Sequence, residues 1–150
     1  MDNSFDINFT FDWSSVLKKD GTEYFFPEKS NLINSKYNCP CIYIWSVFRS
    51  EFDDSKIVYI GETENLIKRV TGYINPGPSQ QTNIRMNNLF DNYLNEGYKI
   101  ALRTLIFEEI KLNDISIVYT DLSNNNIRKA LEQLFLVIYR KENYTILNKN

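Results

Sequence analysis

Residues 41–61, CIYIWSVFRSEFDDSKIVYIG, carry the strongest strand signals in the chain. The stretch from Cys41 to Phe48 is rich in β-branched and aromatic residues, and Lys56 to Ile60 has the same character. The polar residues 49–55 lie between them, and Gly61 ends the second run. Two strands joined by a short polar link predict an antiparallel hairpin.

Helices and further strands are expected downstream of this hairpin. Thr63 can cap a helix that begins at residues 64–65 and stops before the Asn-Pro-Gly-Pro sequence at 75–78. A second helix is expected around residues 84–94, closed by Gly97, and a last one over about 126–141. Strands are predicted over 98–107 and, less distinctly, over 115–119.

The expected architecture is an α+β domain. Its sheet is small, with three or four mainly antiparallel strands, and it is flanked by helices. Residues 1–38 carry aromatic residues without a sustained period, so we interpret them as an N-terminal extension packed on a domain of residues 39–150.

Composition excludes several kinds of function. Seventeen basic and nineteen acidic residues give a net charge of −2, which excludes a binder that relies on bulk positive charge. Histidine is absent, which excludes Ser/His/Asp and Cys/His catalysis and His-ligated zinc. The two cysteines, Cys39 and Cys41, are too few for a zinc site and are expected to be reduced thiols. Any catalysis must therefore use tyrosine, lysine, arginine or carboxylate groups.

Nothing in the sequence predicts a membrane segment. The longest apolar runs fall far short of the roughly 20 residues that a spanning helix needs. The N-terminal residues begin acidic and lack an apolar core, so no signal peptide is expected. These observations favour a cytoplasmic protein.

A set of motifs follows the two expected strands. They are Cys41-Ile42-Tyr43, Val58-Tyr59-Ile60-Gly61, Asn65-Leu66 with Arg69, Ala130-Leu131-Glu132 and Leu147-Asn148. With these motifs, residues 41–148 resemble the GIY-YIG nuclease superfamily. The fold implied by the resemblance, a small sheet flanked by helices, agrees with the elements expected from the sequence.

The resemblance implies a metal-dependent endonuclease that hydrolyses DNA phosphodiester bonds with one divalent ion, Mg²⁺ or Mn²⁺. Glu132 would hold the ion, and the planar guanidinium of Arg69 would clamp a phosphate oxygen. Either Tyr43 or Tyr59 would orient or deprotonate the attacking water, although a phenol has a pKa of about 10. Asn148 would fix the geometry of the site through hydrogen bonds.

Spacing adds one more member to the site. Tyr73 lies four residues after Arg69 and shares its helical face, so we expect it to join the cleft. The candidates for substrate binding are Gly61, Asn65, Lys68 and Arg85. Further side chains that could border the cleft are Arg103, Arg128, Lys129, Gln80, Gln81 and Asn83.

The chain departs from the family pattern at two positions. Cys41 replaces the first glycine, and Glu62 stands where some relatives have lysine. A carboxylate at that position would raise the pKa of a neighbouring tyrosine and so weaken a phenol base. The alternative function is therefore a catalytically inactive nucleic-acid-binding module that retains the fold. An RNA nuclease and an antibacterial toxin domain are also left open, as is the oligomeric state.

Overall fold

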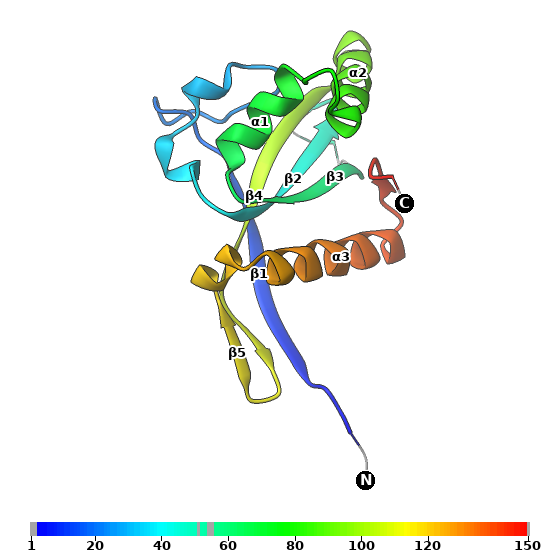
Figure 1. The fold of residues 1–150 in the computed structure, drawn as a ribbon. Helices are drawn as coiled ribbons and strands as arrows, with labels where there is room; N and C mark the ends of the chain where they lie inside the picture. Colours follow the sequence, from blue (N-terminus) through cyan, green and yellow to red (C-terminus); the bar gives the residue numbers. More distant parts are fainter. Residues whose placement is uncertain (1–2, 51, 54–55, 150) are drawn as a thin grey trace.

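The computed structural model describes residues 3–50, 52–53 and 56–149 (Figure 1). Residues 51, 54 and 55 of the expected polar link, and the first two residues of the chain, lie outside this part. The strands are β1 (Ile7–Ser15), β2 (Cys41–Phe48), β3 (Ile57–Thr63), β4 (Lys99–Leu112), β5 (Ile115–Val118) and β6 (Thr145–Ile146). The α-helices are α1 (Leu66–Ile74), α2 (Gln81–Asn95) and α3 (Asn125–Lys141), and short 3-10 helices span Ser30–Leu32, Ser35–Tyr37 and Tyr119–Ser123.

The six strands of the described residues form one sheet, and the prediction of a small sheet with three or four strands is wrong. The order is β1-β4-β2-β3-β6, with β5 also paired to β4. The sheet is mixed, because β6 runs parallel to β3 while the other pairs are antiparallel. The expected hairpin is present as β2 and β3, which pair from Cys41 opposite Thr63 to Val47 opposite Ile57.

Two local features explain the strands that the sequence pattern missed. The β1–β4 register shifts between Phe9 and Phe11, so that Glu108 and Glu109 of β4 together face one residue of β1. Both glutamates are exposed, and this bulge breaks the alternation that would have carried β4 beyond Phe107. β1 is an edge strand with one partner, so few of its residues are buried and its pattern is weak. β6 has two residues, too few for any periodicity.

β2 lies inside the sheet, between β4 and β3, and is buried on both faces. Tyr43 and Trp45 point into one apolar cluster, whereas Ile42 and Ile44 point into another. A strand covered on both faces needs apolar residues at consecutive positions, which is why 41–48 reads as an unbroken apolar and aromatic run.

Helices cover both faces of the sheet (Figure 1). The first cluster packs under α1, α2 and the segment of residues 16–37, and the second under α3. α1 begins at Leu66 rather than at residues 64–65, because the side chain of Asn65, not Thr63, accepts the capping hydrogen bond from the Lys68 backbone. Gly97 follows α2 with a φ of 90°, as expected of a residue that ends a helix.

The N-terminal strand is bound to α3 by aromatic side chains. The ring of Phe135 packs 5.8 Å from Phe9, 4.9 Å from Phe11 and 5.1 Å from Trp13, measured between centroids. The indole of Trp13 also donates a 2.7 Å hydrogen bond to the hydroxyl of Tyr139. The N-terminal segment and the rest of the chain thus share one sheet and one core, and the domain boundary near residue 39 stays a prediction.

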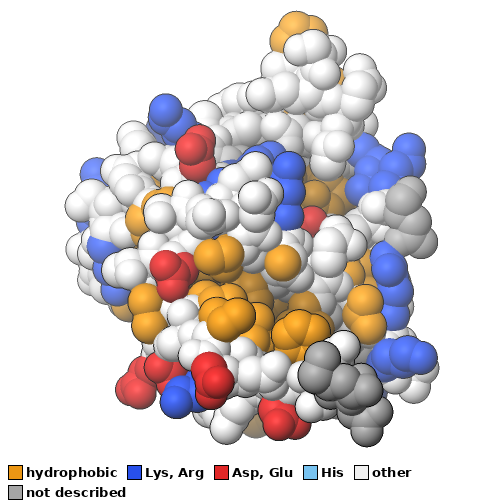
Figure 2. Space-filling model, turned by 60° about the horizontal axis from the view of Figure 1, so that its bottom comes forward, with side chains coloured by type: hydrophobic (Ala, Val, Ile, Leu, Met, Phe, Trp, Pro, Cys, Tyr) orange, Lys and Arg blue, Asp and Glu red, His pale blue; other side chains and the backbone are white. Residues whose placement is uncertain are grey.

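Charge is unevenly distributed on the face shown in Figure 2. Lysine and arginine side chains gather along the right side of that view, and acidic side chains gather at its lower left around an apolar area. None of the described helices is both long and apolar enough to cross a membrane.

Replacing Phe135 by alanine tests the packing of β1 on α3. Phe135 has no exposed surface, and its loss opens a cavity against three aromatic rings, so the free energy of unfolding should fall by about 3–5 kcal/mol. Urea unfolding measures the change. The control Val137→Ala, on the same helix but 53% exposed, should change stability by about 0.5 kcal/mol or less. Equal effects of the two substitutions would contradict this packing.

Candidate functional site

Two tyrosines of the hairpin point to the same face of the sheet. Tyr59 lies opposite Trp45, and Tyr43 lies opposite Gly61, two residues further along β3. A Cβ atom at Gly61 would overlap the ring and hydroxyl of Tyr43. The glycine therefore lets the Tyr43 ring lie directly on the neighbouring strand. Gly61, a predicted substrate-binding residue, is in this structure a packing position.

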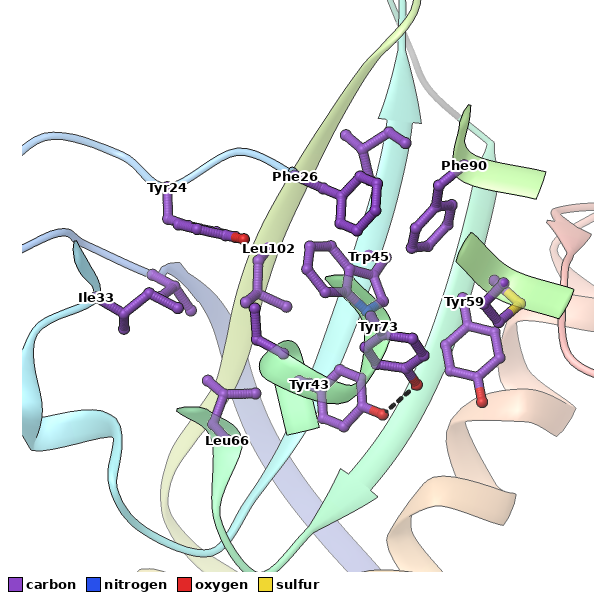
Figure 3. Close-up of a cluster of buried hydrophobic side chains, with 14 of the residues drawn as sticks. Tyr24, Phe26, Ile33, Tyr43, Trp45, Tyr59, Leu66, Tyr73, Phe90 and Leu102 are labelled. Atoms are coloured by element: carbon purple, nitrogen blue, oxygen red, sulfur yellow. Dashed lines mark hydrogen bonds between the residues drawn. The ribbon is translucent and has the colours of Figure 1, made fainter. Parts of the chain in front are cut away.

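Tyr73 of α1 completes a tyrosine group beneath the helix (Figure 3). Its hydroxyl is hydrogen-bonded to that of Tyr43 at 2.6 Å, and its ring packs against Tyr59 at 6.0 Å between centroids. Tyr43 and Tyr73 are each 1% exposed. Burial raises the pKa of both phenols, and neighbouring tyrosines raise it further. These two phenols therefore stay protonated near neutral pH, with one donating the hydrogen bond that joins them, and they are not suited to act as bases.

Arg69 lies one turn before Tyr73 and is half-buried. Its guanidinium makes no hydrogen bond or ion pair with any other side chain or carbonyl in the described part of the chain. Burial lowers the pKa of this guanidinium, but attraction to the neighbouring acidic groups, the three tyrosines in their ionised form and Glu62, raises it by more. A half-buried cation with unused donors is suited to bind an anion.

Arg128 contrasts sharply with Arg69. Its Nε donates to a carboxylate oxygen of Glu62 at 2.7 Å, and one terminal nitrogen donates to the carbonyls of Leu122 and Ser123 at 3.0 and 3.1 Å. Arg128 is 4% exposed, and its hydrogen bonds stabilise the contact between β3 and α3. Arg128 lines the pocket beside α1, as expected, but several of its donors are used within the fold, and its contact with a nucleic acid stays a prediction. Arg128 thus holds the carboxylate of Glu62, the departure that had cast doubt on a tyrosine base.

Glu132 of α3 is half-buried close to these charges. Burial raises the pKa of its carboxyl group, and the charge of Glu62 raises it further, whereas Arg69 acts in the opposite direction. A hydrogen bond from the Glu62 backbone also stabilises the carboxylate. Glu132 thus lies within electrostatic reach of both Arg69 and Glu62.

The donor set around Glu132 fits a hydrated divalent ion. Among the described residues, no three or more histidine, cysteine or acidic side chains form a group that could hold a metal. Mg²⁺ does not need such a group, because it keeps several waters and often binds through one or two carboxylates. A divalent cation would offset the unfavourable proximity of Glu132 and Glu62.

A pocket of about 430 Å³ opens at the N-terminal half of α1. Six of the residues expected at the cleft line it: Asn65, Lys68, Arg69, Gln80, Asn83 and Arg128. Glu62, Glu64 and Gly72 line it as well. Tyr43, Tyr59, Tyr73 and Glu132 are not among the lining residues. The structure therefore brings the arginine to the pocket wall and keeps the phenols beneath it.

The last described residues fasten the open edge of β3. The Asn148 side chain donates to the Ile60 carbonyl at 2.6 Å and accepts from the Ile60 backbone N–H at 3.0 Å. Leu147 N–H bonds Val58 in the same ladder, and the Leu147 carbonyl accepts a 3.1 Å hydrogen bond from Arg85. Asn148 and Arg85 thus hold the strand that carries Tyr59 and do not line the pocket.

Glu62 and Gly72 are the site residues that sequence reasoning undervalued. Glu62 was weighed as a departure from a family, and nothing in the sequence pairs it with a residue 66 positions away. Gly72 could have been found from the sequence, because a glycine inside an amphipathic helix often marks a place where another part of the chain packs closely against the helix.

The tyrosine group should make the free energy of unfolding depend on pH in the alkaline range. Because burial raises the pKa of Tyr43 and Tyr73, the folded state keeps protons that the unfolded state releases above about pH 10. The free energy of unfolding should therefore fall as the pH rises through and above about 10. In the double variant Tyr43→Phe with Tyr73→Phe, urea unfolding should show a shallower fall. The control compares the two proteins near pH 7, where all these phenols are protonated. If the free energy of unfolding fell equally steeply with pH in both proteins above about pH 10, the burial of ionisable phenols would be contradicted.

Asn148→Asp tests the clamp on β3. The substitution replaces the donor to the Ile60 carbonyl by a carboxylate oxygen, so stability should fall by about 1–3 kcal/mol at neutral pH. The control Asn88→Asp makes the same change at an exposed position of α2. If urea unfolding gave both variants the same stability, the side chain of Asn148 would not be holding the strand.

Comparison with known proteins finds no relative for this chain: no family model, no curated protein and no solved structure matches it. The resemblance to GIY-YIG nucleases therefore stays an expectation based on motif residues. The geometry described above is the ground on which a function can be proposed.

Proposed function

We propose that this protein is a metal-dependent endonuclease that hydrolyses phosphodiester bonds of DNA, with Arg69 as its phosphate-binding residue. The observation that carries the proposal is the half-buried Arg69 guanidinium at the wall of a polar pocket, without a partner among the described residues. The neighbouring carboxylate of Glu62 does not compete for it, because Arg128 holds that carboxylate. A phosphate in the pocket would gain two parallel hydrogen bonds from the planar guanidinium.

Other residues of the site support this binding. Lys68 adds a further positive charge to the same pocket, and Asn65 adds a polar side chain. Tyr43 and Tyr73 lie within electrostatic reach of Arg69. Because burial holds these two phenols in the protonated form, their contribution is to position Arg69 and not to accept a proton.

Glu132 is the residue that would hold a divalent ion, with water in the remaining coordination positions. When bound, such an ion would polarise the phosphate and help to activate water. Tyr59 is the least buried of the three site tyrosines at 9% exposed, and we assign it the orientation of the attacking water.

Nicking of supercoiled plasmid DNA with Mg²⁺ or Mn²⁺ tests the proposal. Arg69→Gln and Glu132→Gln should each lower the nicking rate by about 10²-fold or more, because each removes a group that stabilises the charged transition state. Arg69→Lys should fall between Arg69→Gln and the wild type, since it keeps the charge without the planar fork.

The matched control is Lys111→Gln, which removes one positive charge from β4 away from the pocket and should leave the rate unchanged. Wild-type protein that binds the plasmid without nicking it under either metal would overturn the proposal. That result would favour the alternative function, a nucleic-acid-binding module without catalysis.

A further inference from the structure

We infer that Asn83 and Gln80 read the edge of a nucleobase that carries an amino group, beside the phosphate held by Arg69. This inference rests on the proposed function, because it assigns a base-binding wall to the same pocket. Both side chains line that pocket together with Arg69.

A backbone N–H orients the Gln80 amide, and the Gln80 side chain in turn orients the Asn83 amide. The N–H of Gly77, in the loop before α2, donates to the Gln80 side-chain oxygen at 2.8 Å. The same oxygen accepts a 3.2 Å hydrogen bond from the Asn83 side-chain nitrogen. The Gln80 oxygen is thus fully occupied, which leaves the Gln80 amide nitrogen and the Asn83 amide oxygen for another partner.

Asn83 is placed deep in the wall by a glycine of α1. A Cβ atom at Gly72 would lie 2.8 Å from the Asn83 side-chain nitrogen, closer than ordinary packing allows. Gly72 lies three residues after Arg69, on the same side of the helix. The glycine therefore lets α2 bring Asn83 next to the phosphate-binding arginine.

The Asn83 side-chain oxygen is an acceptor at the pocket wall without a partner among the described residues. Asn83 is 8% exposed, and its only side-chain hydrogen bond within the described residues is the one that its nitrogen gives to Gln80. An acceptor that loses water when a ligand binds must find a donor in that ligand, or binding is weakened. The pocket thus selects a ligand that supplies an N–H group at this point.

A nucleobase supplies the complementary pattern. The exocyclic amino group of adenine or cytosine projects from the ring and can reach the recessed Asn83 oxygen, while the adjacent ring nitrogen accepts from Gln80. In thymine, the ring N–H lies between two carbonyl oxygens. A hydrogen bond from this N–H to Asn83 would bring those carbonyl oxygens close to the Asn83 oxygen, which repels them. We therefore assign the site a preference for adenine or cytosine over thymine in unpaired DNA, where base edges are accessible.

The test uses single-stranded homopolymers of deoxyadenylate, deoxycytidylate and thymidylate of equal length. Wild-type protein should bind and cleave the adenine or cytosine polymer about tenfold better than the thymine polymer. Asn83→Leu should reduce this ratio to near one. Gly72→Ala should do the same, because its Cβ would displace the Asn83 amide.

The control Asn88→Leu, at an exposed position of α2, should keep the wild-type ratio. Binding is measured by fluorescence anisotropy without metal, and cleavage with Mg²⁺, so that the two proposals can fail separately. Base preference in binding without cleavage would leave this inference standing and overturn the proposed hydrolysis. Cleavage or binding that ignores the base, or variants that keep the wild-type ratio, would overturn the inference.

Discussion

The packing of the Tyr43 ring on Gly61 is the contact on which the candidate site depends. Because β3 has no side chain at that point, the ring lies on the strand and its hydroxyl reaches Tyr73 at 2.6 Å. That hydrogen bond fixes α1 over the sheet, and α1 in turn carries Arg69. A larger residue at position 61 would displace the ring and, through it, the helix.

A second constraint is the separation of two arginines that have the same chemistry. Arg128 donates to Glu62 and to two backbone carbonyls, so it stabilises the contact between strand and helix. Arg69 lies near the same carboxylate but pairs with none of the described groups. Glu62, which also lines the pocket, thus stabilises the fold through Arg128 and leaves Arg69 without a partner among the described residues. Because Arg128 is used within the fold and Arg69 is not, Arg69 is the side chain most suited to bind an external anion.

Several features of the site follow from local patterns in the chain. Alternation along the hairpin places Tyr43 and Tyr59 on one face, and helical spacing places Arg69 and Tyr73 on one side of α1; the structure has both arrangements. The sheet was underestimated because β1 lies at an edge and β4 contains a bulge at Glu108 and Glu109. The roles of Asn148 and Arg85 were also hidden, since each bonds to backbone groups of distant residues.

The hairpin, the three helices and the faces that their side chains share could be predicted from the amino-acid sequence, because they depend on periodicity over a few residues. Three features became visible in the folded chain alone: Arg128 is bound internally, Arg69 has no partner among the described residues, and Asn83 presents an acceptor to the pocket. The physical reason is that a hydrogen bond or an ion pair belongs to whichever groups the fold brings within about 3 Å, and residues far apart in the chain carry no local mark of that proximity.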